Sequence, residues 1–307
     1  RSADDGHFRR AAEVREARVT MKAIVCVKQV PDTSGKVAVK PDGTLDRASM
    51  ATITNPDDLN ALEAALKLKD ATGCEVVVIT MGPPPAEGML RELLARGADK
   101  AVLVSGREFG GSDTFATSQI LAAAIKKYGV DADDVVFCGR QAIDGDTAQV
   151  GPQVAEKLGL PQVTYAEDIL DITAGKITIK RRLERGIEVV ECPVPCVVTV
   201  NGSAAPCRPR NARYVMKYKY ARATQEMQDA DEDYLNLLQE RPYLKITEWS
   251  VNDITCEAQE LGLSGSPTKV KNIESVVFQA KEAKVLEPSD TAIDEMMKEL
   301  IVNHTVG

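Results

Sequence analysis

The stretch CEVVVITMGPPPAEGMLRELLARGADKAVLV (residues 74–104) decides the fold, because it alternates between two kinds of pattern. CEVVVIT and KAVLV are short runs of mostly branched apolar residues, which predict strands buried on both faces. The intervening AEGMLRELLARGAD repeats its apolar residues at the helical period and reaches Gly97, a residue suited to end a helix. The stretch therefore predicts strand, helix and strand in succession.

The same alternation continues on both sides of that stretch. KAIVCVKQV (residues 22–30) and DDVVFCG (residues 133–139) predict further buried strands. NPDDLNALEAALKLKD (55–70), SDTFATSQILAAAIKKYG (112–129) and TAQVGPQVAEKLG (147–159) predict helices, the second capped by Asp113 or Ser112. Four strand-helix units in succession predict an α/β fold with a mostly parallel sheet and helices on both faces.

The remaining segments predict how the chain is divided. After Pro161 we expect hairpin strands with turns at Ala174-Gly175 and Arg185-Gly186, then a buried strand CVVTV (residues 196–200) that completes the sheet. We expect an α/β domain over residues 21–205 and a tag or disordered extension over residues 1–20. Residues 206–307 are polar and lack a clear apolar helix face, so we expect them to form an extended C-terminal arm that docks on a partner subunit.

Composition excludes several classes of function. The formal charge is −8 and the pI is near 5.1, without a basic cluster interleaved with aromatic residues, so we expect no nucleic-acid partner. No apolar run approaches the roughly 20 residues that span a bilayer, so we expect no membrane insertion. Seven cysteines, an odd number and partly inside apolar runs, fit reduced thiols in a soluble, cytoplasmic protein.

Histidine is nearly absent, and this constrains the chemistry. The two histidines are His7 and His304, each near an end of the sequence, so we expect no histidine-based catalytic or metal site. The spacing CPVPC (residues 192–196) offers too few ligands for a usual zinc or iron–sulfur site. We therefore predict no catalytic side chain and no metal, and we assign the chemistry to a bound cofactor.

The loop that follows DVVFCG is the candidate binding site. Asp144, Gly145 and Asp146 precede Thr147 at the predicted helix start, where free backbone N–H groups and the positive helix end favour a phosphate. The alternative is an aspartate N-cap in an ordinary strand-helix turn. Because carboxylates would repel a diphosphate, we expect Asp144 and Asp146 to brace the loop while Thr147, Gln149 and backbone amides face the ligand.

Five strings together resemble a known family. CVKQVPD, NPDDLNALEAALKLKD, VITMGPP, LARGADKAVLV and GRQAIDGDTAQVGPQVAEKLGLPQVT are similar, in order and spacing, to the beta (small) subunit of electron-transfer flavoproteins, from Met21 to about Val200. The resemblance implies a Rossmann-like α/β fold. It also implies a nucleotide pocket built from Cys26, Asn55, Met81, Gly82, Asp144, Gly145, Asp146, Thr147, Ala148, Gln149, Val150 and Gly151.

The resemblance leaves two subgroups, which differ in the bound nucleotide. Ordinary members hold a structural AMP in this pocket, whereas electron-bifurcating members hold a second FAD that takes hydride from NADH. The segment GREFGGSDTFATS (residues 106–118) resembles the bifurcating members, although a plain loop before a capped helix would also account for its glycines. The resemblance implies NADH-binding residues at Phe109, Gly110, Gly111, Ser112, Asp113 and Thr114.

The resemblance also implies the partners. They are an electron-transfer flavoprotein alpha subunit with its own FAD, ferredoxin, and a flavin dehydrogenase such as an acyl-CoA dehydrogenase. Where the family shows an EPRY-type loop for gripping the dehydrogenase, this chain has PCRPRNARYVMKYKYARATQEM (residues 206–227), which keeps Arg210, Arg213 and Tyr214 in a different order. LSGSPTKV (residues 263–270) resembles the tail that embraces the alpha subunit, and by itself it is a Gly-Ser-Pro turn.

Two alternative functions remain open on the sequence. An ordinary electron-transfer subunit would use the same pocket for AMP and would not oxidise NADH. A stand-alone, ATP-dependent stress-type α/β protein would share the sheet and a nucleotide, since fold alone does not determine function.

Overall fold

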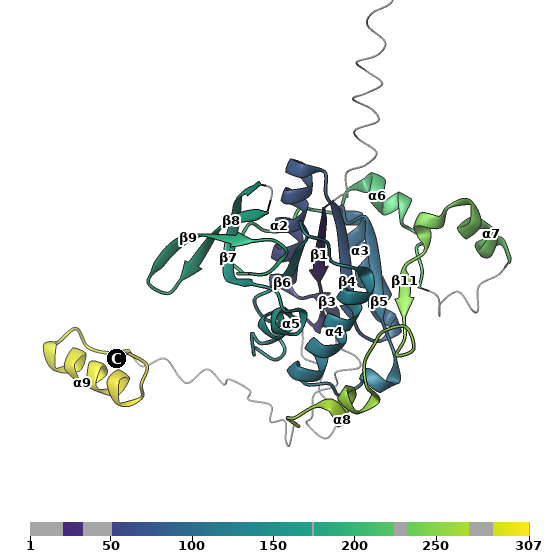
Figure 1. Ribbon diagram of the computed structural model, residues 1–307. Coiled ribbons are helices and arrows are strands. Elements are labelled where there is room, and N and C mark those ends of the chain that lie inside the picture. The colour runs from purple at the N-terminus through teal and green to yellow at the C-terminus, as the bar shows by residue number, and fades with distance from the viewer. Residues whose placement is uncertain (1–20, 33–50, 174, 224–231, 270–284, 307) are drawn as a thin grey trace, which may run out of the picture.

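A nine-stranded sheet forms the centre of the molecule (Figure 1). The computed structural model describes residues 21–32, 51–173, 175–223, 232–269 and 285–306. The strands are β1 (Lys22–Cys26), β4 (Glu75–Met81), β5 (Lys100–Val104), β6 (Val135–Gly139), β7 (Gln162–Thr173), β8 (Lys176–Leu183), β9 (Gly186–Pro193), β10 (Cys196–Val200) and β11 (Thr247–Trp249). Their order across the sheet is β11-β5-β4-β1-β6-β10-β7-β8-β9.

In this sheet every pair of neighbouring strands from β11 to β7 is parallel, whereas the pairs β7–β8 and β8–β9 are antiparallel. Two further strands, β2 (Gln29–Pro31) and β3 (Thr52–Thr54), form a separate antiparallel pair. The mostly parallel, Rossmann-like sheet predicted from the sequence is confirmed.

Helices cover both faces of the sheet. Helices α2 (Pro56–Thr72) and α3 (Glu87–Arg96) pack on one face, and α4 (Thr114–Tyr128) and α5 (Val150–Leu158) pack on the other. Successive residues of a strand point to opposite faces. Val25 of β1 accordingly joins the core under α2 and α3, while its neighbour Ile24 joins the core under α4 and α5. The predicted helices therefore cover both faces of the sheet, as expected.

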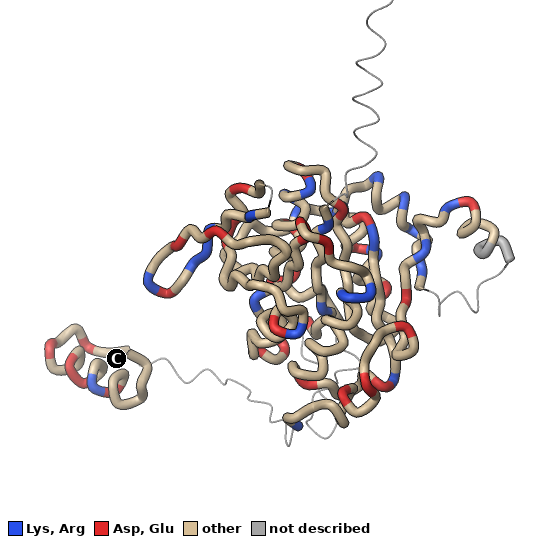
Figure 2. The backbone as a smooth tube through the Cα atoms, in the orientation of Figure 1, with Lys and Arg blue, Asp and Glu red and all other residues tan. Residues whose placement is uncertain are grey.

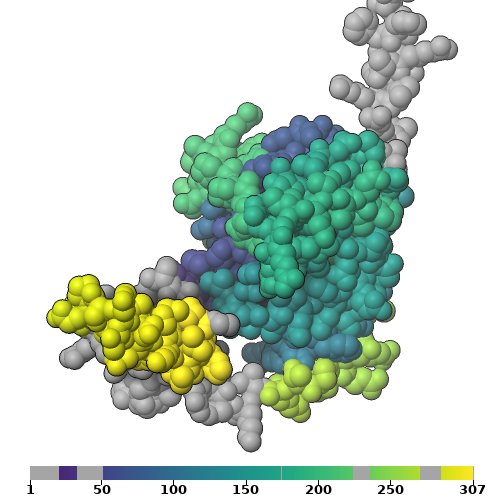
Figure 3. Space-filling view, turned by 90° about the vertical axis from the view of Figure 1, so that its left-hand side faces the viewer, coloured from purple at the N-terminus to yellow at the C-terminus, as the bar shows by residue number. Residues whose placement is uncertain are grey.

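The strands after Pro161 also follow the prediction, with one difference in order. The strands β7, β8 and β9 form an antiparallel meander, and β10 is fully buried. The second turn lies at Glu184 and Arg185, one residue before the expected position, and Ala174 of the first expected turn lies outside the described residues. In the sheet β10 lies between β6 and β7, which leaves the meander at one edge (Figure 1). Viewed from that edge, the meander and the yellow C-terminal helix occupy separate parts of the surface (Figure 3).

Part of the segment expected to be an arm packs on the domain itself. It contains α6 (Ala212–Lys217), α7 (Glu232–Glu240), α8 (Gly262–Gly265) and α9 (Asp290–Val302), with short 3₁₀ turns at η4 (Pro242–Leu244) and η5 (Ala258–Glu260). Strand β11 extends the sheet beside β5, and Leu244 and Ile246 are buried in the core. Helix α9 lies apart from the body in Figure 1, and it has no buried residue.

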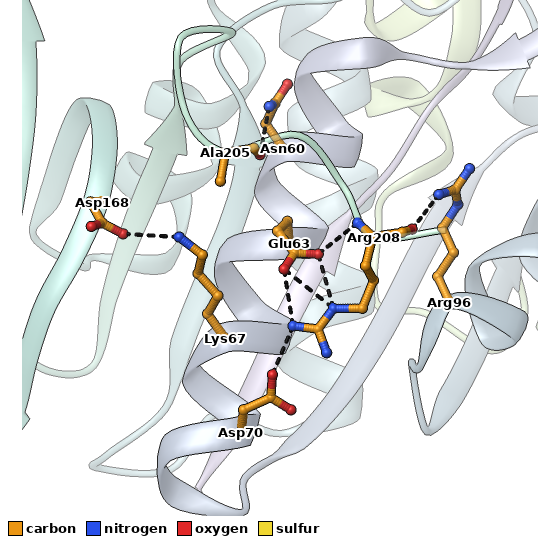
Figure 4. A network of polar contacts seen from close by, with 8 residues as sticks. All are labelled: Asn60, Glu63, Lys67, Asp70, Arg96, Asp168, Ala205 and Arg208. Atoms are coloured by element: carbon orange, nitrogen blue, oxygen red, sulfur yellow. Dashed lines mark hydrogen bonds and ion pairs between the residues drawn. The ribbon is translucent and has the colours of Figure 1, made fainter. Parts of the chain in front are cut away.

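A network of polar side chains ties the segment after β10 to helix α2 (Figure 4). The Arg208 guanidinium donates to both carboxylate oxygens of Glu63 at 3.0–3.2 Å and to Asp70 at 2.8 Å. The backbone N–H of Arg208 also donates to Glu63, at 2.9 Å. Because Glu63 is a buried carboxylate, this paired arrangement offsets the cost of removing its charge from water.

Charges of both signs are spread over the described backbone (Figure 2). Exposed ion pairs such as Lys67 with Asp168, 3.4 Å apart, contribute little stability because water screens them. The buried polar contacts beside α2 therefore contribute more to the stability of the fold than the exposed ion pairs do.

Candidate functional site

A cavity of about 320 Å³ opens where β1, β4 and β6 end. Strand β1 lies between β4 and β6 in the sheet. The helix that follows β1 in the chain, α2, packs on one face of the sheet, whereas the helix that follows β6, α5, packs on the other. Open α/β sheets bind ligands at such a reversal point, outside the carboxyl ends of the strands. The cavity therefore lies where the topology predicts a ligand.

Most of the residues predicted to bind a nucleotide line this cavity. The loop from Asp144 to Gly151 lines it throughout, and three residues of the predicted NADH segment line it as well. The predicted residues on its wall are Cys26, Met81, Ser112, Asp113, Thr114, Asp144, Gly145, Asp146, Thr147, Ala148, Gln149, Val150 and Gly151. The two predicted segments thus share one cavity.

Five predicted residues stand outside the wall. Gly82, Phe109, Gly110 and Gly111 are not among the lining residues, and Phe109 is buried in the core beneath α4. Asn55 is completely buried, and its side chain holds the loop after β6: its amide donates to the Gln141 carbonyl at 2.8 Å, and its oxygen accepts from the Ile143 N–H at 3.1 Å. Asn55 therefore shapes the cavity through the loop.

Asp58 lies on the cavity wall and was not predicted. Its carboxylate accepts from the Lys28 N–H at 2.8 Å and from the Gly139 N–H at 3.1 Å, so it joins the ends of β1 and β6. Burial raises the pKa of Asp58 to about 7, although hydrogen bonds from Asn55, Lys28 and Gly139 favour the charged form. In the sequence, an aspartate in the first turn of a helix looks ordinary, so nothing indicated this role.

The loop from Arg140 to Gln149 is held by its own carboxylates. Asp144 pairs with the Lys28 ammonium at 2.7 Å, and Asp146 accepts from the Gln141 amide at 2.8 Å. These contacts agree with the expectation that both aspartates brace the loop. Asp146 and Ala148 have φ values of 50° and 52°, a left-handed conformation that is costly for residues with a side chain.

The predicted start of the following helix was wrong. The sequence placed it at Thr147, but α5 begins at Val150, because the left-handed Ala148 interrupts the turn before it. The first-turn N–H groups of a helix have no partner within it, so those of Val150 and Gly151 are available to a ligand, while Pro152 has none. Thr147 and Gln149 lie on the cavity wall as part of the loop.

Gly151 allows α5 to approach the sheet closely. A Cβ atom at this position would lie 2.6 Å from Thr199 Cγ2 and 3.4 Å from Cys138 Cβ. Any side chain here would push the helix start away from β6 and β10. The cavity therefore depends on a glycine at its base.

Helix α4 brings the predicted NADH segment to the other side of the cavity. Of the two predicted caps, Asp113 is the one used, and it accepts from the Ala116 N–H at 3.0 Å. Partial burial favours a higher pKa for Asp113, but hydrogen bonds from Thr268, Ala116 and Phe115 outweigh it and lower the pKa. The Thr114 hydroxyl donates to the Gln149 side chain at 2.9 Å, which joins the two walls.

Two thiols form part of the cavity floor. Cys26 is the last residue of β1, Cys138 is the last but one of the neighbouring β6, and both line the cavity. A hydrogen bond with the Cys26 thiol, and then burial, raise the pKa of Cys138 well above its usual value. Cys138 is therefore a neutral thiol at neutral pH and is not suited to act as a nucleophile.

Several lining residues were missed by the sequence reasoning. Besides Asp58, they are Val27, Lys28, Thr117, Leu121, Cys138, Gly139, Arg140, Gln141 and Ala142. Arg140 directly follows β6 and Lys28 comes two residues after β1, so their place near strand ends was the available signal. A larger groove of about 790 Å³, beside α2, α3 and α6, contains none of the predicted site residues.

Within the described residues, no three His, Cys, Asp or Glu side chains are grouped so that they could hold a metal ion. No helix in the described part of the chain has the length and apolar character to cross a membrane.

Comparison with known proteins agrees with the fold. Residues 42–226 match the family model of the electron transfer flavoprotein domain. The chain is 42% identical to "Electron transfer flavoprotein subunit beta" of Clostridium acetobutylicum over 93% of this chain and 100% of that protein.

Two other relatives carry names that refer to reductases. The chain is 66% identical to "Acryloyl-CoA reductase electron transfer subunit gamma" of Anaerotignum propionicum, over 58% of this chain and 67% of that protein. It is 46% identical to "Caffeyl-CoA reductase-Etf complex subunit CarD" of Acetobacterium woodii, over 81% of this chain and 86% of that protein.

Proposed function

The chain belongs to the electron transfer flavoprotein family, among its beta subunits, and from this premise we propose that it serves an electron-bifurcating heterodimer. In this proposal the cavity at the ends of β1, β4 and β6 holds FAD. NADH is the hydride donor. Electrons leave to ferredoxin and, through the FAD of an alpha subunit, to a flavin dehydrogenase such as an acyl-CoA dehydrogenase. The seven free cysteines suit a cytoplasmic complex.

The observation that carries this proposal is the shared cavity. The loop from Asp144 to Gly151 forms one wall, and residues Ser112 to Thr114 form another. Its volume of about 320 Å³ falls within the usual range of small-molecule pockets. One cavity with two candidate binding segments suits a pair of nucleotides that must come close for hydride transfer.

The residues present fit a dinucleotide. The N–H groups of Val150 and Gly151 and the hydroxyl of Thr147 supply donors for a phosphate, while Asp144 and Asp146 are held by Lys28 and Gln141. When bound, FAD would supply the step between two-electron transfer from NADH and one-electron transfer to later carriers. The chain's own groups would bind and orient both nucleotides.

The relatives favour a reductase complex over a simple shuttle. One is named as an electron transfer subunit of acryloyl-CoA reductase, and another as a subunit of a caffeyl-CoA reductase-Etf complex. By that likeness, the final partner is a flavin enzyme that reduces an acyl-CoA.

The second candidate is an ordinary beta subunit that holds AMP. The same loop and helix start would bind the AMP phosphate, so the wall from Asp144 to Gly151 does not separate the candidates. The Ser112–Thr114 side of the cavity favours FAD with NADH, because a structural AMP needs no second nucleotide beside it.

An anaerobic titration of the purified heterodimer with NADH tests the proposal. We expect NADH to bleach the flavin absorbance of the wild-type complex. Gly111→Val should weaken this reaction and leave the flavin content unchanged, because Gly111 has a φ of 75° and a Cβ there would lie 2.6 Å from Leu263. The matched control is Gly129→Val, at a φ of 94° but in open space at the far end of α4. A wild-type complex that NADH does not reduce contradicts the proposal.

A further inference from the structure

The C-terminal segment folds back onto the cap of helix α4. The Thr268 backbone N–H and hydroxyl both donate to Asp113 Oδ2, at 2.9 and 2.7 Å. The Asp113 N–H in turn donates to the Ser266 hydroxyl oxygen at 2.9 Å. We call these three hydrogen bonds the Asp113 clasp. It joins residues 155 positions apart, and one of its members lies on the cavity wall.

The two backbones are shaped to meet at this point. Gly262 has a φ of 55°, and a Cβ there would lie 2.3 Å from the Glu108 carbonyl oxygen. Gly111, on the opposing loop, would likewise place a Cβ 2.6 Å from Leu263. The two loops can approach this closely only because Gly111 and Gly262 have no side chain, so the contact depends on a glycine in each loop.

The clasp is anchored by groups other than its own hydroxyls. Leu261 and Ile254 are buried in the same core as Phe109, and the Gln119 amide donates to Glu260 at 3.2 Å. Thr268 itself is exposed. The fold of this region therefore does not depend on the Thr268 hydroxyl, and the role of that hydroxyl can be tested in a folded protein.

The clasp determines where the Asp113 carboxylate points. Oδ1 accepts from the Ala116 N–H and Oδ2 accepts from Thr268, so both oxygens are engaged within the protein. A carboxylate free to rotate at this place would repel the phosphates of a dinucleotide. With the carboxylate held, Ser112 and Thr114 can present their side of the cavity to a ligand.

We propose that Thr268 and Ser266 are positioning residues for the nicotinamide nucleotide, acting through Asp113; this rests on the proposed function. They do not line the cavity themselves. Their effect is to fix the carboxylate and the first turn of α4 in the geometry that the second nucleotide meets. The C-terminal segment therefore contributes to nucleotide binding as well as to any contact with a partner.

The test compares three variants of the full chain in its purified heterodimer. Thr268→Val removes the hydroxyl and keeps the shape, whereas Thr268→Ser keeps the hydroxyl. Ser264→Ala, in the short helix α8 four residues before Thr268, is the matched control because Ser264 is exposed and makes none of the clasp contacts. The probe is NADH, measured by calorimetry, and the steady-state KM and kcat of NADH oxidation are measured in parallel.

We expect Thr268→Val to raise the Kd and KM for NADH by about fivefold, the value of one hydrogen bond. The kcat and the flavin content should stay at the wild-type level. Thr268→Ser and Ser264→Ala should both behave as the wild type does. This pattern separates positioning from a general loss of structure, because a structural role would also lower the flavin content.

Three outcomes overturn the inference. If Thr268→Val binds NADH as tightly as the wild type, the clasp has no positioning role, and the proposed function still stands. If Thr268→Val loses flavin along with NADH affinity, the clasp is merely structural. If the wild-type complex does not bind NADH at all, both the inference and the proposed function are contradicted.

Discussion

Two of the buried carboxylates of helix α2, Asp58 and Glu63, have different kinds of hydrogen-bond partner. In its first turn, Asp58 accepts hydrogen bonds from the Lys28 and Gly139 N–H groups. Near its middle, Glu63 pairs with the guanidinium and the backbone N–H of Arg208 (Figure 4). The first place faces the cavity, and the second holds the segment that follows β10.

The two kinds of hydrogen-bond partner distinguish the cavity at Asp58 from the Glu63–Arg208 pair, which has a structural role and is called the structural tie below. A guanidinium stays charged at all relevant pH values, and hydrogen bonds with Glu63 and Asp70 raise the pKa of Arg208 further. Backbone N–H groups carry no full charge, and burial raises the pKa of Asp58 to about 7. The charge of Asp58 next to the cavity can therefore change near neutral pH, whereas the Arg208 guanidinium keeps its charge.

The largest effect on nucleotide binding is expected at the cavity base. Gly151→Val should weaken nucleotide binding by about tenfold or more, because the new side chain collides with Thr199 and Cys138 and displaces the start of α5. Nucleotide extracted per purified heterodimer, measured by chromatography, checks this. Gly145→Ala is the control, since a Cβ there meets nothing within 4 Å. Normal nucleotide content in Gly151→Val would show that the cavity is misplaced.

The next effect is the pH dependence of stability due to Asp58. Its pKa is about 7 when folded, against 3.8 for the unperturbed group. Between these values the native state keeps a proton that the unfolded state has released, so stability falls as pH rises from about 4 to 7. We expect Asp58→Asn to remove a slope of at most about 1.4 kcal/mol per pH unit. Urea unfolding across this pH range measures it, and an unchanged slope would contradict the assignment.

At the structural tie, Glu63→Ala should lower the free energy of unfolding by about 2 kcal/mol, because Arg208 would lose its main partner. The loss stays below that of a fully buried pair, since the Arg208 side chain is 32% exposed. Nucleotide content should not change. Lys67→Ala, on the same helix and in an exposed pair, is the control and should cost less than about 0.5 kcal/mol. Equal losses in the two variants would contradict the tie.

The smallest effect is expected at Lys28, which braces the loop from outside. Lys28→Met breaks an ion pair with Asp144 whose side chains are 49% and 31% exposed. We expect a loss of about 0.5 kcal/mol in nucleotide binding, which should diminish as salt is added. Nucleotide affinity measured in low and high KCl checks this. An effect that does not change with salt would contradict the role of a screened ion pair at Lys28.

The periodic segments could be predicted from the sequence, because their pattern depends on local burial. The runs ending at Cys26 and Gly139 are apolar on both faces, and Gly97 ends α3 as expected. The start of α5 could not be predicted in this way. Alanine favours helices, so nothing in the sequence shows that Ala148 adopts a left-handed conformation.

Features that depend on distant partners were also missed. Strand β11 has only three residues, and it forms because β5 offers an open edge. The Asp113 clasp needs a segment 155 residues away, and Asp58 gains its role from the ends of β1 and β6. The predicted loop from Asp144 to Gly151 lies on the cavity wall because strand ends meet at one edge of a parallel sheet, a rule that holds without side-chain detail.

Extraction and identification of the nucleotides in the native heterodimer is the most direct test of the central claim, which is that the cavity at the ends of β1, β4 and β6 holds a redox dinucleotide. The account predicts two FAD molecules per heterodimer. One FAD with one AMP would contradict electron bifurcation at this cavity. A complex with no adenine nucleotide beyond the FAD of the alpha subunit would contradict the cavity as a binding site.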